Sequence, residues 1–241
     1  MRDPYPSTVP IKYDPDGNAQ AYVGNSIICP LSPSSLLYGS LLGLREKLRN
    51  SSLSHLFARD ALMEPANWHM TFFIGARDKI RSEGYWPKDV PLDMPQDEVL
   101  ELLTDKLRKF DLQCDPPYKM KISGPGQTNY SISVHLTPET AEEDRLKDLR
   151  NRLSDHLCIR HPEHDKFKFH LTLAYLLRWL DDGQKQELDA LLQEHFEALP
   201  AQVEMGGPTF CTFQDMKGWK PVLQLKNLTA AGPSAWSSGC P

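Results

Sequence analysis

The stretches KFHLTLAY (residues 168–175) and NWHMTFFIG (residues 67–75) alternate apolar and polar side chains. Successive side chains of a β-strand point to opposite faces of its sheet, so both stretches are predicted to form strands with one buried, apolar face. On the other face, each strand presents a histidine and, two residues later, a threonine. The fold must therefore bury one side of each stretch and leave a His-x-Thr pair on the other.

These pairs are His69 with Thr71 and His170 with Thr172. Near neutral pH an imidazole can accept or donate a proton, and a threonine hydroxyl can donate a hydrogen bond to a phosphoryl oxygen. Two such pairs that face each other supply one acid, one base and two anchors for a phosphate group. We therefore expect these four residues to be catalytic and to line one cleft. The alternative is that both histidines only make structural hydrogen bonds.

A third copy of the pattern lies at His135 and Thr137, also on an alternating strand. Thr137 directly precedes Pro138, and proline is favoured at the first position of a helix. The Thr137 hydroxyl is therefore expected to cap a helix that begins at Pro138. On this interpretation, His135 lies at the end of a strand and away from the cleft.

Apolar periodicity predicts an α+β chain around these strands. Helices are expected over residues 33–49, 96–110, 137–157 and 181–199. Further strands are expected over residues 21–29, 118–123, 130–136, 203–205, 209–213 and 222–225, and a proline-rich loop over residues 84–95. We expect a single domain over residues 19–228, with a flexible N-terminal segment (1–18) and a flexible C-terminal tail (229–241).

The composition restricts the class of protein. The chain has 241 residues, of which 40% are hydrophobic and 24% charged, and its net charge is -5. This apolar content suffices for a folded core, while the acidic balance argues against a protein that binds long nucleic acids. No run approaches the roughly 20 apolar residues of a membrane span. The N-terminus contains no apolar signal region, and the five cysteines include no C-x-x-C pair. We therefore expect a cytoplasmic protein with reduced thiols and no structural zinc site.

Several longer stretches resemble one known family. They are KYDPDGNAQAYVGNSII (12–28), NWHMTFFIG (67–75), RSEGYWP (81–87) with PLD (91–93), RHPEHDKFKFHLTLAY (160–175) and FCTFQDMKGWKPV (210–222). In these stretches the sequence is similar to the 2H phosphoesterase superfamily and, within it, resembles the DUF1868 subgroup, which is described as RNA ligase/cyclic nucleotide phosphodiesterase-like. The resemblance spans about residues 12–228. It implies a bilobal fold, with two pseudo-symmetric antiparallel sheets and outer helices around a central cleft.

The resemblance also implies a metal-independent cyclic phosphodiesterase, a hydrolase that needs no cofactor. On a 2′,3′-cyclic phosphate, one histidine would take the proton of the attacking water and the other would protonate the leaving ribose oxygen. The two threonines would bind the phosphoryl oxygens. The expected partner is a small-molecule substrate, with a nucleotide or an RNA end included, and neither a long nucleic acid nor a membrane. The protein is expected to be a monomer.

A second class of function uses the same histidines. A lyase, isomerase or cyclase could employ them as acid and base on a small natural product without phosphate. Cationic side chains distinguish the two classes, because a phosphate site should place an arginine or lysine beside the threonines.

Five further side chains are expected to contact the substrate. Arg81 occupies a family position and could reach an anion, and Tyr85 and Trp86 could stack on a base. Lys168 shares the polar face of the second motif. Strict alternation places Tyr175 on the apolar face, so it reaches the substrate only if the strand bulges.

Two other groups near the motifs are interpreted as structural. His161, His164 and Asp165 precede the second motif, but their spacing fits a metal site poorly and no cysteine is close in sequence. We expect them to form a hydrogen-bonded loop. Arg77 follows the first motif and is interpreted as a solvated loop residue.

Overall fold

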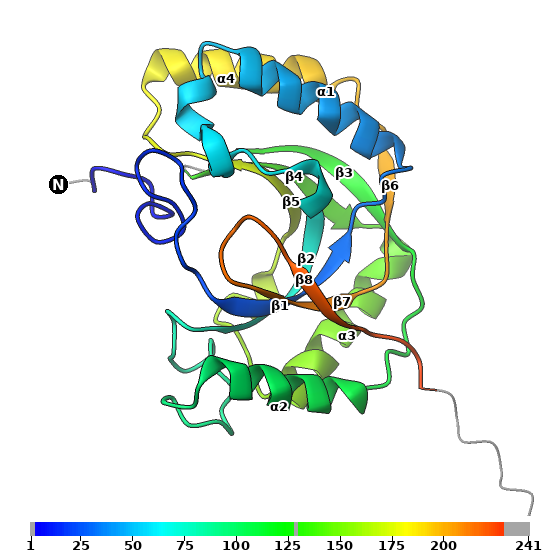
Figure 1. Cartoon of the computed structure of the whole chain (residues 1–241). Coiled ribbons are helices and arrows are strands. Elements are labelled where there is room, and N and C mark those ends of the chain that lie inside the picture. Colours follow the sequence, from blue (N-terminus) through cyan, green and yellow to red (C-terminus); the bar gives the residue numbers. More distant parts are fainter. Residues whose placement is uncertain (1–2, 128–129, 229–241) are drawn as a thin grey trace, which may run out of the picture.

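The chain folds into eight strands and four α-helices in the computed structural model, which describes residues 3–127 and 130–228 (Figure 1). The strands are β1 (Gly24–Pro30), β2 (His69–Arg77), β3 (Tyr118–Gln127), β4 (Ser131–Pro138), β5 (Phe169–Tyr175), β6 (Gln202–Met205), β7 (Thr209–Phe213) and β8 (Lys220–Gln224). The α-helices are α1 (Leu36–Asn50), α2 (Gln96–Arg108), α3 (Thr140–Leu157) and α4 (Asp182–Phe196). Each lies where the sequence pattern predicts it, with differences of a few residues at the ends.

The strands form one antiparallel sheet in the order β6-β3-β4-β5-β2-β1-β7-β8. Its halves, β6-β3-β4-β5 and β2-β1-β7-β8, meet where Met70 of β2 pairs with Leu171 of β5. Both of these side chains are fully buried. The halves correspond to the two expected sheets, so the α+β class and the bilobal antiparallel arrangement are confirmed.

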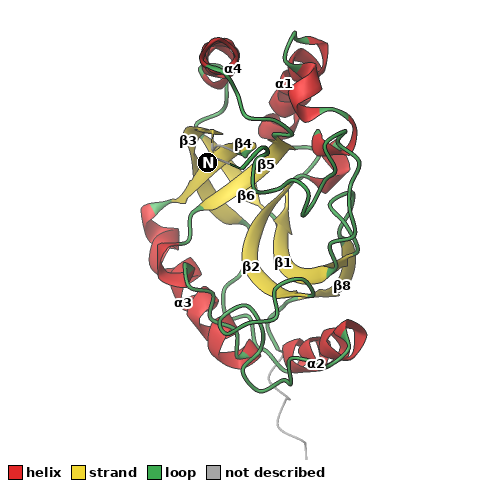
Figure 2. Ribbon diagram, turned by 90° about the vertical axis from the view of Figure 1, so that its left-hand side faces the viewer, coloured by secondary structure: helices red, strands yellow, loops and turns green. Residues whose placement is uncertain are grey.

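The helices cover the sheet in two pairs. Figures 1 and 2 show α1 and α4 together at one end of the molecule, and α2 and α3 toward the other end. The Lys47 amino group of α1 lies 2.9 Å from the Glu194 carboxylate of α4. The His156 ring of α3 donates a hydrogen bond to the Lys106 carbonyl of α2, at 2.7 Å. None of the helices in the described ranges combines the length and the apolar composition that crossing a membrane requires.

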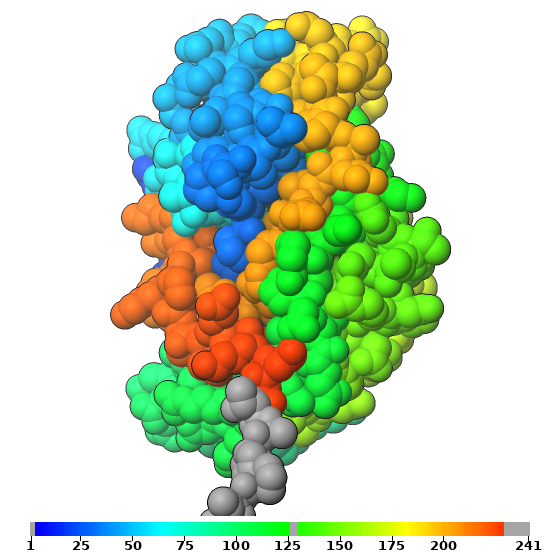
Figure 3. Space-filling view, turned by 90° about the vertical axis from the view of Figure 1, so that its right-hand side faces the viewer, coloured from blue at the N-terminus to red at the C-terminus, as the bar shows by residue number. Residues whose placement is uncertain are grey.

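The segment that follows β8 contacts the segment that precedes β3, although the two are about a hundred residues apart in the sequence. After β8, the Asn227 side chain donates a hydrogen bond to the Asp115 carboxylate at 2.7 Å, and the Leu112 N–H donates to the Lys226 carbonyl at 3.3 Å. Figure 3 shows these orange-red C-terminal residues beside the green residues that lead into β3. The part of the chain expected to form one domain, residues 19–228, contributes every strand of this sheet.

The two motif strands bulge at equivalent positions. Across β1 and β2, Ile27 pairs with Phe73 and Ile28 with Thr71, which leaves Phe72 as an extra residue. Across β4 and β5, Ile132 pairs with Ala174 and Ser133 with Thr172, which leaves Leu173 as the extra residue. In each strand, two consecutive buried residues then follow the threonine, and the next side chain is half-buried on the motif's side. The two halves therefore share a local deformation as well as a motif.

The N-terminal segment is packed against the rest of the molecule over the residues that the structure describes. Tyr13 is fully buried and Val9 is 5% exposed. Val9 and Tyr13 belong to an apolar cluster with Leu177 and Phe213. This packing corrects the expectation of a flexible segment for residues 3–18. The expected flexible tail, residues 229–241, lies outside the described residues.

The third His-x-Thr motif differs from its expected role. Thr137 stays in β4, where it pairs with Lys121, and its hydroxyl lies 2.5 Å from the Ser123 hydroxyl. Helix α3 begins at Thr140, and its N-cap residue Glu139 makes no side-chain capping bond. The prediction of a Thr137 cap is therefore wrong, because strand pairing extends β4 through Pro138.

Strand β2 passes close to β1 at Gly75. A Cβ atom at this position would overlap the side chain of Asn25 and lie 2.8 Å from its carbonyl oxygen. Asn25 is fully buried, and its Oδ1 accepts a hydrogen bond from the Ala76 N–H at 3.0 Å. We expect Gly75→Ala to lower the free energy of unfolding by about 1–3 kcal/mol, measured by urea denaturation.

Gly39→Ala is the matched control for this substitution. Gly39 lies in α1, and a Cβ there would meet no atom within 4 Å. This variant is expected to be neutral or to stabilise the protein by up to about 1 kcal/mol. Equal stability of the two variants would contradict the tight approach of β2 to β1.

Candidate active site

Both predicted His-x-Thr pairs line one pocket, a cavity of about 160 Å³ beside the junction of β2 and β5. Because these strands are antiparallel, the neighbours of the buried junction pair set His69 opposite Thr172 and Thr71 opposite His170. The two histidines then occupy one diagonal and the two threonines the other. Residues on such a diagonal lie about 7–8 Å apart, so one phosphoryl group between the imidazoles can contact both.

Each imidazole is oriented by the backbone that leads into its own strand. The Nδ1 atom of His69 lies 2.6 Å from the Asn67 carbonyl oxygen, and that of His170 lies 3.0 Å from the Lys168 carbonyl oxygen. A carbonyl oxygen only accepts hydrogen bonds, so Nδ1 carries the proton in both rings. Nε2 is therefore the nitrogen that can exchange a proton with a ligand. The two motifs repeat the same contact, to the carbonyl two residues earlier.

His69 has the more apolar environment. Burial lowers the pKa of His69 to about 4; the hydrogen bond to Asn67 raises it and the neighbouring His170 lowers it. The Trp219 ring packs against this imidazole, with 4.4 Å between the ring centroids. His69 is therefore neutral at neutral pH, and its Nε2 can accept a proton.

Two cations line the same pocket. They are Lys12, from the N-terminal segment, and Arg77, from the end of β2. Lys12 donates a hydrogen bond to the Tyr175 hydroxyl at 3.3 Å, and Arg77 donates one to the Tyr22 hydroxyl at 3.1 Å. The Nε atom of Arg77 is buried without a hydrogen-bond partner among residues 3–127 and 130–228. The pocket thus combines positive charge with hydroxyl groups, as an anion site requires.

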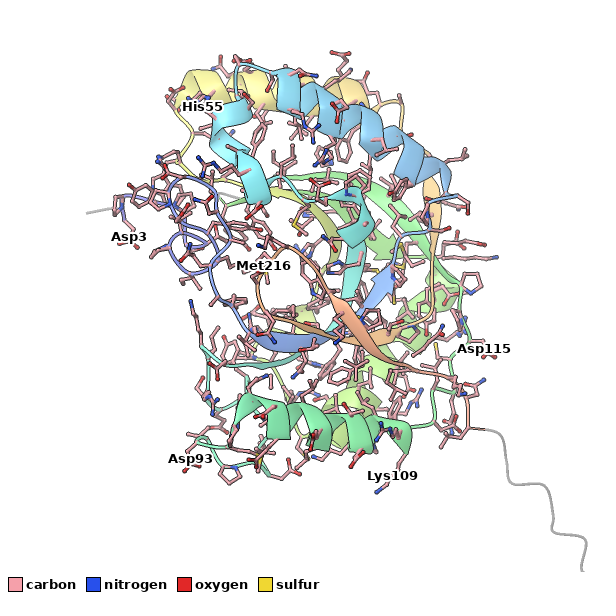
Figure 4. All side chains as sticks on the ribbon, in the orientation of Figure 1. Asp3, His55, Asp93, Lys109, Asp115 and Met216 are labelled. Atoms are coloured by element: carbon pink, nitrogen blue, oxygen red, sulfur yellow. The ribbon has the colours of Figure 1, made fainter. Side chains whose placement is uncertain are left out.

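Aromatic side chains form much of the remaining wall. They are Tyr22, Phe167, Tyr175, Phe213 and Trp219. Tyr175 reaches the pocket because β5 bulges at Leu173, the condition under which the sequence predicts this contact. Met216 also lines the pocket, and Figure 4 shows it near the middle of the molecule, between the two helix pairs.

The family model described as "2H-phosphodiest: Domain of unknown function (DUF1868)" matches residues 12–131. The chain belongs to this 2H phosphoesterase family. The matched range contains the first motif, while the second motif lies beyond it. Membership supports phosphodiesterase-type activity in general, and hence a phosphoesterase hydrolase.

Solved structures resemble the fold to different degrees. One is the crystal structure of ATU0111, a conserved protein of unknown function from Agrobacterium tumefaciens. It is 25% identical, with a TM-score of 0.83 over 92% of this chain and 94% of that chain. A phosphoesterase structure aligns over 86% of this chain and 100% of that chain, with 12% identity and a TM-score of 0.46. LigT of E. coli, complexed with phosphate, aligns over the same shares, with 15% identity and a TM-score of 0.42. A search of curated proteins gives no match.

Arg81 and Trp86 do not line the pocket of this 2H phosphoesterase. Arg81 donates hydrogen bonds to the carbonyls of Leu92 and Met94, both at 2.7 Å, and pairs with Asp78. Trp86 is 1% exposed, and its ring NH donates to the Pro91 carbonyl at 3.1 Å. The expected substrate contacts are therefore corrected, because both side chains already stabilise the proline-rich loop.

Tyr85 and Lys168 also lie outside this pocket lining. The Tyr85 ring packs edge-on against His161, at 4.5 Å between centroids, and under the guanidinium of Arg77, at 5.6 Å. Lys168 is exposed and lines a second pocket, beside His135. The sequence predicted that Lys168 contacts the substrate at the motif pocket. The structure corrects this prediction, because Lys168 precedes the first residue of β5 and lines the second pocket instead.

The loop before the second motif is stabilised by hydrogen bonds, as predicted. The His164 ring donates to the Asn151 side chain at 3.1 Å, and Asp165 pairs with Arg160 at 2.6 Å. Burial lowers the pKa of His164 to about 4, and the neighbouring Arg150 acts in the same direction. No group of three or more His, Cys, Asp or Glu side chains arranged to bind a metal occurs in the described ranges.

The sequence predicted five of the residues that line the pocket; Lys12, Arg77 and Trp219 are among those that it did not predict as contacts. Lys12 and Trp219 belong to stretches that resemble the family, but their side chains are distant from both motifs in sequence. Alternation from Thr71 does place Arg77 on the motif's face, because β2 has two register shifts that cancel, but Arg77 was interpreted as a loop residue beyond the strand. The sequence signal that could have found Arg77 is its position as a cation six residues after Thr71.

The low pKa of His69 can be measured directly. In an NMR titration, the His69 imidazole is expected to stay neutral on acidification until a midpoint near pH 4. Trp219→Ala should raise this midpoint toward the usual value near 6.5, because water then reaches the ring. A wild-type midpoint near 6.5 would contradict the desolvated environment of His69.

Proposed function

We propose that this pocket hydrolyses a small phosphoester of the 2′,3′-cyclic phosphate type by histidine acid–base catalysis without a metal. The observation that supports the proposal is the pair of imidazoles across one pocket, each with Nδ1 bound to the carbonyl two residues earlier. This arrangement makes Nε2 of both rings available to the two sides of a phosphoryl group. In-line displacement at phosphorus requires a base on one side and an acid on the other.

The burial of His69 favours it as the base. Its lowered pKa keeps the imidazole neutral, so Nε2 accepts a proton from water as the water oxygen attacks phosphorus. The bond from phosphorus to the 2′ or 3′ ribose oxygen breaks, and protonated His170 donates its Nε2 proton to that oxygen. The product is a phosphomonoester. Proton exchange with solvent then restores neutral His69 and protonated His170.

The remaining polar groups bind the charge that develops on the phosphoryl oxygens. Thr71 and Thr172 occupy the other diagonal of the junction and offer two hydroxyl donors. Lys12 and Arg77 add positive charge at the same pocket. Donors held in place before the reaction stabilise a transition state more than donors that must first reorient.

These two cations favour the phosphodiesterase over the lyase, isomerase or cyclase alternative. A substrate without phosphate offers no phosphoryl oxygens for the lysine, the arginine and the two threonines to bind. The aromatic wall suits both classes, because it can stack on a nucleobase or on another planar ring.

Substitution of the motif residues tests the proposed roles. With 2′,3′-cyclic nucleotides in EDTA, His69→Gln and His170→Gln should each lower kcat by about 10²- to 10⁴-fold. Thr71→Val and Thr172→Val should each cost about 10- to 150-fold, because each removes one hydrogen bond to a charged oxygen. On acidification, kcat/KM of the wild type should fall through about pH 4, where His69 gains its proton.

His55→Gln is the control for the histidine variants, since His55 is exposed on a short helix outside the pocket (Figure 4). It should retain wild-type kcat. Activity lost in EDTA and restored by a divalent ion would refute the metal-free mechanism. No turnover of any phosphoester by the folded protein would favour the lyase, isomerase or cyclase alternative.

Arg77 and Arg81 form a matched pair that tests the cation. Arg77→Gln should lower kcat/KM on the order of tenfold or more, because it removes a charge from the pocket. Arg81→Gln should instead lower the melting temperature and leave kcat/KM within about twofold, because Arg81 serves the loop. The opposite result would assign the anion-binding role to Arg81, as the sequence alone suggested.

A further inference from the structure

The third His-x-Thr motif adjoins the proposed active site. His135 of β4 pairs directly with His170 of β5, so both side chains lie on the same face of the sheet. One repeat further along the strands, the antiparallel register sets Thr137 opposite Lys168. His135, Thr137 and Lys168 line a second pocket of about 480 Å³, and Phe167 lines both this pocket and the first. The second pocket therefore lies beside the motif pocket, with Phe167 between them.

Free positive charge lies around this second pocket. Lys147 and Lys168 are exposed and form no ion pair within the described part of the chain, and both contribute to the lining. Of the two carboxylates in the lining, Asp165 is paired with Arg160 at 2.6 Å. Glu143 is the remaining acidic group, and it is exposed. Two lysines thus stand against one unpaired carboxylate.

Helix α3 contributes four residues to the lining. Glu143, Lys147, Arg150 and Asn151 are spaced by three, four or one residues, which places them side by side along the helix. Arg150 is 6% exposed and donates hydrogen bonds to the carbonyls of Phe72 and His164. Its guanidinium lies 3.9 Å from the centre of the Phe167 ring. This packing fixes Phe167, the side chain that separates the two pockets.

Neutral donors complete the pocket. The hydroxyls of Ser123 and Thr137 are hydrogen-bonded to each other, so one of the two still has a proton to donate outward. The His135 ring makes no hydrogen bond to any of the described residues. It therefore lacks the contact through Nδ1 that orients His69 and His170. This set of groups suits the binding of an anion, without the oriented base that catalysis requires.

We infer that the second pocket binds a second phosphate of the substrate, on the 5′ side of the ribose that bears the cyclic phosphate. This inference rests on the proposed function and narrows its substrate class to nucleotides with a 5′-phosphate or to RNA ends. Strands are about 4.8 Å apart and rise about 3.4 Å per residue, so one strand across and two residues along is about 8 Å. That offset is comparable to the length of one nucleotide.

The experiment compares substrates that differ by one phosphate. Wild-type protein should hydrolyse 5′-phosphoadenosine 2′,3′-cyclic phosphate with kcat/KM on the order of tenfold higher than adenosine 2′,3′-cyclic phosphate. A dinucleotide with a terminal cyclic phosphate should share this advantage, and its methylphosphonate analogue, which lacks the bridging charge, should lose it. Advantage for the mononucleotide alone would identify a terminal 5′-phosphate as the ligand, and advantage for the dinucleotide alone would identify an RNA end.

The double variant Lys147→Gln/Lys168→Gln should abolish the preference, and Lys147→Gln alone should reduce it while leaving hydrolysis of adenosine 2′,3′-cyclic phosphate unchanged. Lys185→Gln, which alters an exposed lysine of α4, is the control and should keep the preference. Rising salt should reduce the preference in the wild type, because both lysines are exposed.

The outcomes separate the two proposals. The second phosphate site would be overturned by equal kcat/KM for the two adenosine substrates and for the two dinucleotides. A preference that survives the double variant would overturn it as well. In both cases, hydrolysis of the cyclic phosphate would still uphold the proposed function. No turnover of any of the substrates would overturn both.

Discussion

The pairing of β2 with β5 is the contact on which the candidate site depends. Met70 and Leu171 are fully buried there, and they join the two halves of the sheet. A slip of one residue would turn one histidine and its threonine into the core and expose apolar side chains instead. The hydrophobic effect that holds the halves together therefore also sets which residues face the pocket. Stability of the core and geometry of the site are not independent in this fold.

The features that sequence alone could predict are those with a local pattern. Alternation in residues 67–75 and 168–175 predicted both strands, their buried faces and the four motif residues that meet in one pocket. Leucines at helical spacing predicted the helices, because each helix buries one stripe against the sheet. The hydrogen-bonded loop at His164 was also predictable, since its polar residues had the wrong spacing for a metal.

What the sequence could not predict depends on contacts between distant segments. Consecutive apolar residues follow each motif threonine, so the sequence does not show where the strands bulge, yet the bulge at Leu173 turns Tyr175 into the pocket. Arg81 looked available for an anion, but three residues of the following loop engage it. Thr137 followed by Pro138 predicted the start of a helix, but these residues pair with β3 and remain in the strand.

The hydrogen bond from each motif imidazole to the carbonyl two residues earlier has an evolutionary consequence. In a Ser-His-Asp triad, the group that orients the histidine comes from another part of the chain. Here the orienting carbonyl lies two residues before the histidine. A copy of this short segment would therefore contain both the histidine and the group that orients it. A gene duplication of one lobe would thus deliver the second imidazole already aligned. After such a duplication, substitutions around the motif would leave the imidazole oriented as long as the local backbone kept its course.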